Sequence, residues 1–106
     1  MNLLSFKPEE FHVAEAKAHP KMNMYYYTFH SNEDGENIAI EFCVQFEENE
    51  INVLRVLQMN KYKRELFDHS KTPPLLLQIS WGRFYQAHKS DAKMKDIRLK
   101  ELFLRK

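Results

Sequence analysis

Glycine is scarce in this sequence. Gly35 and Gly82 are the only glycines among 106 residues, whereas an average protein has roughly 7% glycine. Loops that cradle phosphate groups need several glycines, and the chain contains no P-loop, dinucleotide-binding fingerprint or nucleophile elbow. This shortage argues against a nucleotide-dependent enzyme.

Cysteine and long apolar runs are also scarce. Cys43 is the single cysteine, so no disulfide forms within the chain, which fits a reducing cytosol. The longest apolar runs, such as 75–77, fall far short of the roughly 18 residues that a membrane-spanning helix needs. Residues 1–6 lack the basic start and apolar stretch of a signal peptide. We therefore expect a cytoplasmic protein without membrane association.

Length and composition predict one globular domain. A chain of this size buries roughly two-thirds of the surface that its unfolded form exposes, which is enough for one core. The sequence is 43% hydrophobic and 29% charged, too apolar for a disordered chain and too charged for a membrane protein. No repeat, linker or low-complexity segment divides it, so residues 1–106 are predicted to form a single domain.

A net charge of +1 conceals a division of charge along the chain. Residues 1–54 hold 3 Lys/Arg and 10 Asp/Glu, a balance of −7, and residues 55–106 hold 13 Lys/Arg and 5 Asp/Glu, a balance of +8. Two opposite fields on one molecule can each steer a complementary surface. The alternative is that the two halves face each other in the folded chain and cancel.

The first predicted element is a helix over residues 8–18. Pro8 suits the first helical position, and Glu9 and Glu10 fall in the first turn, where the helix dipole favours acidic side chains. Pro20 forces the residue before it toward extended backbone, so the helix ends by there. Alternation over the same range also permits a strand, but its alanines favour the helix.

The middle of the chain predicts an antiparallel meander of at least three strands. Residues 24–30 are rich in aromatic side chains and precede a run of turn formers that contains Asp34-Gly35. The return strand, 38–47, alternates apolar and mostly polar side chains, and 51–59 is apolar on both faces, as central strands are. One face of this last strand is predicted to carry Ile51, Val53, Leu57 and Met59, and the other Leu54 and Val56.

The remaining elements are predicted from caps and spacing. A short helix over 61–69 follows Asn60, a suitable N-cap. Residues 75–81 fit both a strand and a helix, and we prefer a short fourth strand that gives way to helix near Gly82. A last helix spans 90–106. The predicted fold is therefore α+β, a three- or four-stranded antiparallel β-meander with an N-terminal helix and C-terminal helices packed on it.

No constellation identifies a catalytic or metal site. His12 and His19 would lie about 10.5 Å apart along one helix, too far to share an ion. His30 with Glu33 and Asp34 would bind a cation only loosely in an acidic turn. We therefore predict no catalytic residue, no metal and no cofactor, although a small metal-independent nuclease remains an alternative, because histidine, lysine, arginine, tyrosine and glutamate suffice for it.

Two kinds of partner fit the residues. The basic half, interleaved with aromatic residues, is the mixture that holds phosphates and stacks bases. Its predicted nucleic-acid-binding residues are Lys61, Lys63, Arg64, Arg83, Lys89, Lys93, Lys95, Arg98 and Lys100.

A protein partner is the preferred hypothesis. Neighbouring side chains of a strand point to opposite faces, so at least one of three consecutive tyrosines lies away from the core, and tyrosine is enriched in interface hot spots. The predicted partner-binding residues are Tyr25, Tyr26, Tyr27, Glu47, Glu48 and Glu50. We predict a small non-enzymatic protein-binding module of the inhibitor, immunity, antitoxin or adaptor type that associates through complementary charge. Nucleic-acid binding is the alternative, and the oligomeric state stays open.

Overall fold

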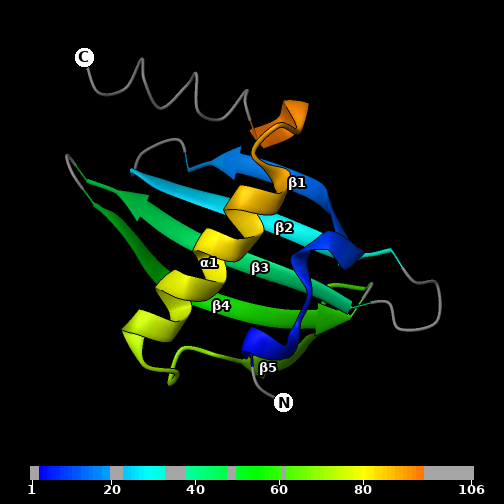
Figure 1. The fold of residues 1–106 in the computed structure, drawn as a ribbon. Coiled ribbons are helices and arrows are strands. Elements are labelled where there is room, and N and C mark those ends of the chain that lie inside the picture. The colour runs from blue at the N-terminus through cyan, green and yellow to red at the C-terminus, as the bar shows by residue number, and fades with distance from the viewer. Residues whose placement is uncertain (1–2, 20–22, 33–37, 48–49, 61, 95–106) are drawn as a thin grey trace.

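The described part of the chain forms a five-stranded antiparallel sheet with an α-helix across one face (Figure 1). The computed structural model describes residues 3–19, 23–32, 38–47, 50–60 and 62–94. Spatial order follows chain order: β1 (Phe11–Ala18), β2 (Met24–Ser31), β3 (Ile38–Phe46), β4 (Ile51–Asn60) and β5 (Glu65–Asp68). The 3-10 helices η1 (Leu3–Ser5) and η2 (Pro8–Glu10) precede β1, and α1 (Pro74–His88) follows β5. The predicted α+β class and the antiparallel meander are confirmed, with five strands instead of three or four.

The helix predicted over residues 8–18 is wrong. Only the segment from Pro8 to Glu10 is helical, as a 3-10 helix, and Phe11 already has the extended φ of −120° and ψ of 162°. The following residues pair with β2 along the whole of β1. Backbone pairing and burial in a sheet outweigh the helix propensity of the alanines, which is a weak preference.

A bulge in β1 interrupts the alternation of inward-facing and outward-facing side chains along this strand. The pairing with β2 shifts between Val13 and Glu15, which moves the inward-facing positions by one residue. Phe11 and Val13 therefore face the core before the bulge, and Ala16 and Ala18 pack against it afterwards.

The helix predicted over 61–69 is also wrong, because β5 occupies this range. The Asn60 side chain does bond to backbone N–H groups, but it closes a turn instead of capping a helix. Its Oδ1 accepts from the backbone N–H of Tyr62 at 2.9 Å and of Arg64 at 3.0 Å. Lys63 in this turn has a φ of 63°, in the left-handed region that few residues besides glycine adopt. The chain thereby returns along β4.

A second bulge corrects the faces predicted for β4. The pairing of β3 with β4 shifts beside Leu54, so Val53 and Val56 both face α1. Leu57 and Met59 fall on the opposite face, apart from Val53, because an extra residue changes the phase of the alternation. β4 does lie inside the sheet, between β3 and β5, as its apolar character on both faces indicates.

The ambiguous segment 75–81 is helical throughout. α1 begins at Pro74, a residue that suits the first helical turn. Leu77, Trp81 and Phe84 recur at helical spacing and are buried on the side that meets the sheet. The preferred short strand was wrong because burial at this spacing requires a helix.

Aromatic side chains fill the core between α1 and the sheet. The Trp81 ring centroid lies 4.8 Å from that of Tyr27 on β2. The Phe84 ring centroid lies 4.9 to 5.3 Å from those of three strand residues, Phe11, Phe29 and Phe42. Each such pair contributes about 0.5–1.5 kcal/mol beyond the buried area alone, so this face of the sheet holds α1 in place.

The opposite face of the sheet carries no described helix, and we call it the open face. The alternation and register of the strands place these side chains on it: His12, Glu15, Lys17, Tyr26, Thr28, His30, Ala39, Glu41, Cys43, Arg55, Leu57 and Met59. Charged and polar side chains dominate it, although Thr28, Ala39, Cys43 and Met59 are buried among their neighbours.

The segment after α1 is described only as far as Met94, which is buried in the core. Asp91 accepts a hydrogen bond from the backbone N–H of Lys93 at 2.9 Å. Most of the helix predicted over 90–106 lies outside the described residues. None of the described helices is long and apolar enough to cross a membrane.

Candidate functional site

The candidate site is centred on Tyr26, near the middle of the open face. Tyr26 is directly opposite Lys17 on β1 and Cys43 on β3, and Cys43 is opposite Arg55 on β4. These four side chains form one row across four strands. Opposite side chains on one face lie about 4.5–5.5 Å apart at Cβ, so the row presents two cations on either side of a half-buried aromatic ring and a thiol.

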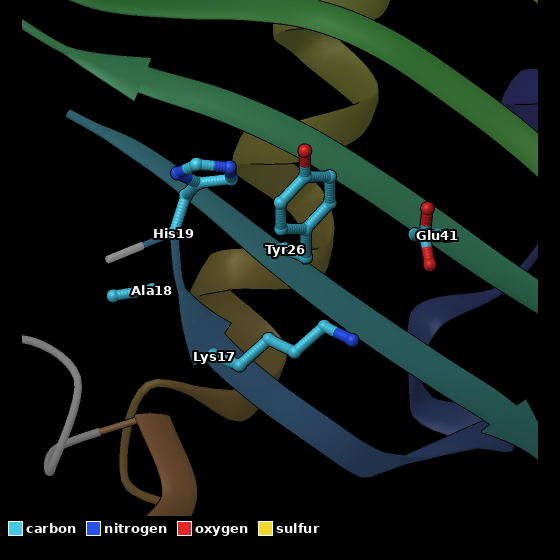
Figure 2. A pocket seen from close by; sticks show the side chains of 5 residues that line it. All are labelled: Lys17, Ala18, His19, Tyr26 and Glu41. Carbon is cyan, nitrogen blue, oxygen red and sulfur yellow. The ribbon is translucent and has the colours of Figure 1, made fainter. Parts of the chain in front are cut away.

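A hollow lies beside this row. Its volume is about 460 Å³, and it is lined by Lys17, Ala18, His19, Tyr26 and Glu41. Figure 2 shows the Tyr26 ring between His19 and Glu41, with the Lys17 side chain extending below it. The Lys17 Nζ lies 6.0 Å from the centroid of the Tyr26 ring, within the range of a cation–π contact.

Tyr26 and Cys43 are both held in their neutral forms. Burial is the main cause that raises the pKa of Tyr26, and the nearby Cys43 and Glu41 raise it further, against the opposing effect of Arg55. Burial also raises the pKa of Cys43, while its hydrogen bond with Tyr26 and the charge of Arg55 act in the opposite direction. A protonated, buried thiol is a poor nucleophile. The row therefore offers aromatic contact and hydrogen bonds rather than covalent chemistry.

The charged side chains around the row form ion pairs at the surface. Lys17 Nζ lies 3.6 Å from the Glu15 carboxylate. Arg55 lies 3.5 Å from Glu65 and 3.6 Å from Asp68, both on β5. Exposed pairs of this kind contribute about 0–1 kcal/mol each to stability, so their charges remain available to a partner at little structural cost.

These ion pairs show how the acidic and basic halves of the sequence are distributed on the open face. Lys17 and Glu15 belong to the acidic half, and Arg55 and its two carboxylate partners belong to the basic half. Charges of both signs therefore meet on the open face within each half of the sequence. The described structure does not separate the two halves into one acidic and one basic surface there.

Only one of the three predicted partner-binding tyrosines is available on a surface. Tyr25 is 0% exposed and Tyr27 is 2% exposed, both on the face that meets α1, so neither side chain can contact a partner. Tyr26 points the other way, as the alternation of a strand requires. Glu47 and Glu50 are exposed at the bend between β3 and β4, and Glu48 lies outside the described residues.

Five of the nine predicted nucleic-acid-binding residues lie in the described part of the chain, in the turn before β5, on α1 and just after α1. Arg83 on α1 donates to the Leu4 backbone oxygen at 2.8 Å, and Lys89 follows the end of α1. Arg64 is exposed beside β5. Four others lie outside the described residues: Lys61, Lys95, Arg98 and Lys100.

Lys63 and Lys93 are two predicted basic residues, from segments distant in sequence, whose charges both act on His30. With His12 they lower the pKa of its imidazole, which burial lowers most. His12 lies opposite His30 across β1 and β2. In the described part of the chain, no group of three or more His, Cys, Asp or Glu side chains is arranged to hold a metal ion.

Sequence reasoning missed Lys17, Glu41 and Arg55 as neighbours of Tyr26. Glu41 was recognised as a polar position of a strand, but its position beside Tyr26 depends on the register of β2 with β3. Lys17 belonged to a segment predicted as helix. The alternation of Glu15 and Lys17 was the one signal that would have placed both on the open face.

Comparisons with protein-family models, with curated proteins and with solved structures find no match to this chain. The fold and the site define the chain as an α+β protein with an antiparallel sheet, and its function has to be inferred from the site itself.

Proposed function

We propose that this protein is a small non-enzymatic binding module that associates with another protein through the open face of its sheet. The observation that carries the proposal is the position of Tyr26. Its half-buried ring lines a hollow of about 460 Å³ that side chains of both charges, Lys17 and Glu41, also line. Tyrosine at the centre of such a surface is the residue type that dominates binding energy in protein interfaces.

The packing of the molecule supports this assignment. The aromatic core, α1 and the 3-10 segments all belong to one side of the sheet, so the fold does not need the open face for that packing. The three central strands, β2, β3 and β4, are held by pairing on both sides, and β1 and β5 are the edges of the sheet. A rigid surface loses little conformational entropy when it binds, which favours association.

Charge complementarity supplies the selectivity in this proposal. The carboxylates of Glu15, Glu41 and Asp68 alternate with the cations of Lys17 and Arg55 across the face. A partner with the inverse pattern gains on-rate and excludes competitors, because a like charge placed opposite any of these groups is repelled. The proposal therefore commits to a folded protein partner with mixed surface charge.

The chemistry of the site favours binding over catalysis. Neither Tyr26 nor Cys43 ionises near neutral pH, because burial raises the pKa of each. A general base or nucleophile needs a pKa near the working pH. Tyr26 and Cys43 are therefore unsuited to act as a general base or a nucleophile at neutral pH.

Comparative capture tests the proposal. The tagged full-length protein, Tyr26→Ala and Tyr62→Ala are each incubated with a nuclease-treated extract of the native host, and retained proteins are identified by mass spectrometry. Tyr62 is 77% exposed and lies in the turn before β5, so its variant matches the chemical change at a different place. We expect a partner that wild type and Tyr62→Ala retain and that Tyr26→Ala binds at least about 30-fold more weakly, the loss typical of a hot spot.

Folding of each variant is checked by circular dichroism and by denaturation. If folded Tyr26→Ala retains the same proteins with the same affinity as wild type, the open face is not the binding surface. If proteins are captured from an untreated extract but none from the nuclease-treated extract, nucleic acid is the partner and the proposal is wrong.

A further inference from the structure

Two histidines and a lysine converge at one end of the open face. His12 of β1 and His30 of β2 are direct cross-strand partners, and their ring centroids lie 5.9 Å apart with the ring planes at 73°. The Lys93 Nζ, from the segment after α1, lies 3.2 Å from the backbone oxygens of both Val13 and Ala14, next to His12 along β1. Three segments distant in sequence therefore contribute cationic or protonatable nitrogens to one place.

Lys63 adds a fourth such group from the turn between β4 and β5. Its backbone has a φ of 63°, and its N–H donates to the Asn60 oxygen at 3.0 Å. The turn follows β4 at Asn60, which pairs with Ile38, one residue before the partner of His30 on β3. The charge of Lys63 reaches His30, as do those of His12 and Lys93.

One described carboxylate lies on the same segment as Lys93, because Asp91 Oδ1 accepts a hydrogen bond from the Lys93 backbone N–H at 2.9 Å. Glu15 and Glu41 are the nearest on the open face by register, and both are opposite Thr28, two residues along β2 from His30. That separation is about 7 Å along the strand. Glu15 is already paired with Lys17 at 3.6 Å, and neither carboxylate is among the groups that set the pKa of His30. Like charges gathered in this way repel each other unless an anion lies between them.

One hydrogen bond orients the His12 ring and leaves one of its nitrogens for contact with a ligand. Its Nδ1 lies 2.7 Å from the Asn32 Oδ1, and an amide oxygen only accepts, so Nδ1 carries the proton. The ring is thereby oriented and its Nε2 is the nitrogen left for another contact. When Nε2 is protonated, it becomes a charge-assisted donor of the kind that binds oxyanions most strongly.

We propose that His12, His30, Lys63 and Lys93 form a binding site for a divalent oxyanion, a phosphate group that is either free or carried by a nucleotide. This site is separate from the Tyr26 row and goes beyond the proposed association with a protein. The lysines supply permanent charge, and the histidines add charge on protonation. The site therefore binds its anion more tightly at lower pH, where histidine side chains gain a proton.

Sulfate and phosphate separate the contributions of protein and ligand. Sulfate keeps its double charge throughout this pH range, whereas a phosphate monoester has a second pKa of about 6. A change in sulfate affinity with pH therefore reports protonation of the protein alone. By linkage, each histidine whose pKa the anion raises by about one unit adds about a tenfold gain in affinity across its titration.

The experiment uses the full-length chain and follows the histidine ring protons by NMR. Sodium sulfate is titrated at about pH 5.5 and about pH 8, on either side of the ordinary histidine pKa, with ionic strength held constant by sodium chloride. We expect saturable shifts of the His12 and His30 signals and tighter binding at the lower pH. Absence of saturable shifts at both pH values would overturn the proposal.

Two matched lysine variants test the location of the site. Lys63→Gln removes a charge from the cluster, and Lys89→Gln removes an equal charge beyond the end of α1. We expect Lys63→Gln to weaken sulfate binding about tenfold, the effect of one lost charge-assisted hydrogen bond, and Lys89→Gln to leave it unchanged. Equal weakening of sulfate binding by both variants would mean that sulfate responds to the overall positive charge of the protein and not to a defined site, which contradicts the proposal.

Further arms identify the ligand and the competing possibility. Inorganic phosphate and adenosine monophosphate are titrated at the lower pH: equal affinities assign the site to phosphate alone, and tighter binding of the nucleotide assigns it to a nucleotide. Zinc is the counter-test, because Glu33 and Asp34 follow β2 in the sequence. Saturable zinc binding at the two histidines without sulfate binding would replace the anion site by a cation site. We expect Lys63→Gln to capture the protein partner as wild type does, whatever the anion and zinc titrations show. Failure of the anion site is therefore distinct from failure of the proposed protein-binding function.

Discussion

The two faces of the sheet are built from the same strands but have different roles. On the face that meets α1, Tyr25 and Tyr27 are 0% and 2% exposed and pack among aromatic rings. On the open face, Tyr26 stands half-buried between charged groups. Three consecutive residues of one type thus divide between core and surface, because side chains alternate along a strand.

This difference separates stability from recognition. Aromatic burial on the covered face supplies the large, non-directional stabilisation of the fold. Exposed ion pairs on the open face contribute little to the stability of the fold. They create a charge pattern that a partner with complementary charges can recognise. Variants on the two faces should therefore have effects of different size and kind.

The largest effect is expected from Tyr27→Ala. This change removes a fully buried ring that contacts Trp81 at a centroid distance of 4.8 Å, and large aromatic truncations in cores cost about 3–5 kcal/mol. The free energy of unfolding is measured by urea denaturation. Tyr26→Ala is the matched control, for which we expect a loss of about 1 kcal/mol. Similar losses for the two variants would remove the distinction between the faces.

An intermediate effect is expected from Lys93→Met. The Lys93 ammonium donates to two backbone oxygens at the bulge of β1, each at 3.2 Å, and joins the segment after α1 to the edge of the sheet. Loss of this contact should reduce stability by about 1–3 kcal/mol. Lys89→Met is the control. A thermal unfolding midpoint that falls equally in both variants would show that the contact at the bulge contributes nothing.

Acidification should weaken the fold through histidines. Burial is the main cause that lowers the pKa values of both His30 and His69 below the ordinary value. The unfolded chain then binds protons more readily than the folded chain, so their stabilising contribution is complete above about pH 6.5. It is lost as the pH falls from there through the folded-state pKa values.

The unfolding free energy is measured against pH for wild type and His30→Gln. The variant should show a shallower decrease than wild type in this acid window. A steeper decrease would mean that protonation of His30 stabilises the folded chain, opposite to the direction expected.

The smallest effect is expected from Arg55→Gln. Arg55 is paired with Glu65 and Asp68 at 3.5 and 3.6 Å, but all three side chains are substantially exposed. The loss in unfolding free energy should be at most about 1 kcal/mol and should shrink further in high salt. A loss as large as that of Tyr27→Ala would show that the open face also holds the fold together.

Local pattern predicted the central strands well and the ends of the chain poorly. Residues 24–30, 38–47 and 51–59 became β2, β3 and β4, because turn formers bound them and β-forming side chains alternate within them. The failures at 8–18 and 61–69 share one cause. In both segments weak local helix signals were outweighed by hydrogen bonds to a neighbouring strand, which are contacts with residues distant in sequence.

The candidate site was predicted only in part for the same reason. Alternation alone indicated that one tyrosine of three leaves the core, and the register identifies it as Tyr26. The partners of that residue come from β1, β3 and β4, so no spacing along the chain could name them. The helix predicted over residues 8–18 likewise gave no indication that His12 pairs with His30, because that pairing requires a strand.

By itself, the sequence determined the α+β class, the antiparallel meander and the absence of familiar nucleotide-binding loops, because composition, alternation and turn residues are local properties. Only the tertiary structure decided which face each side chain occupies. Register shifts in three strand pairings, beside Val13, Leu54 and Met59, change the phase of the strands, and a change of one residue moves the following side chains to the other face. The register across the sheet then decided that Tyr26 lies between Lys17 and Cys43, and His12 beside His30.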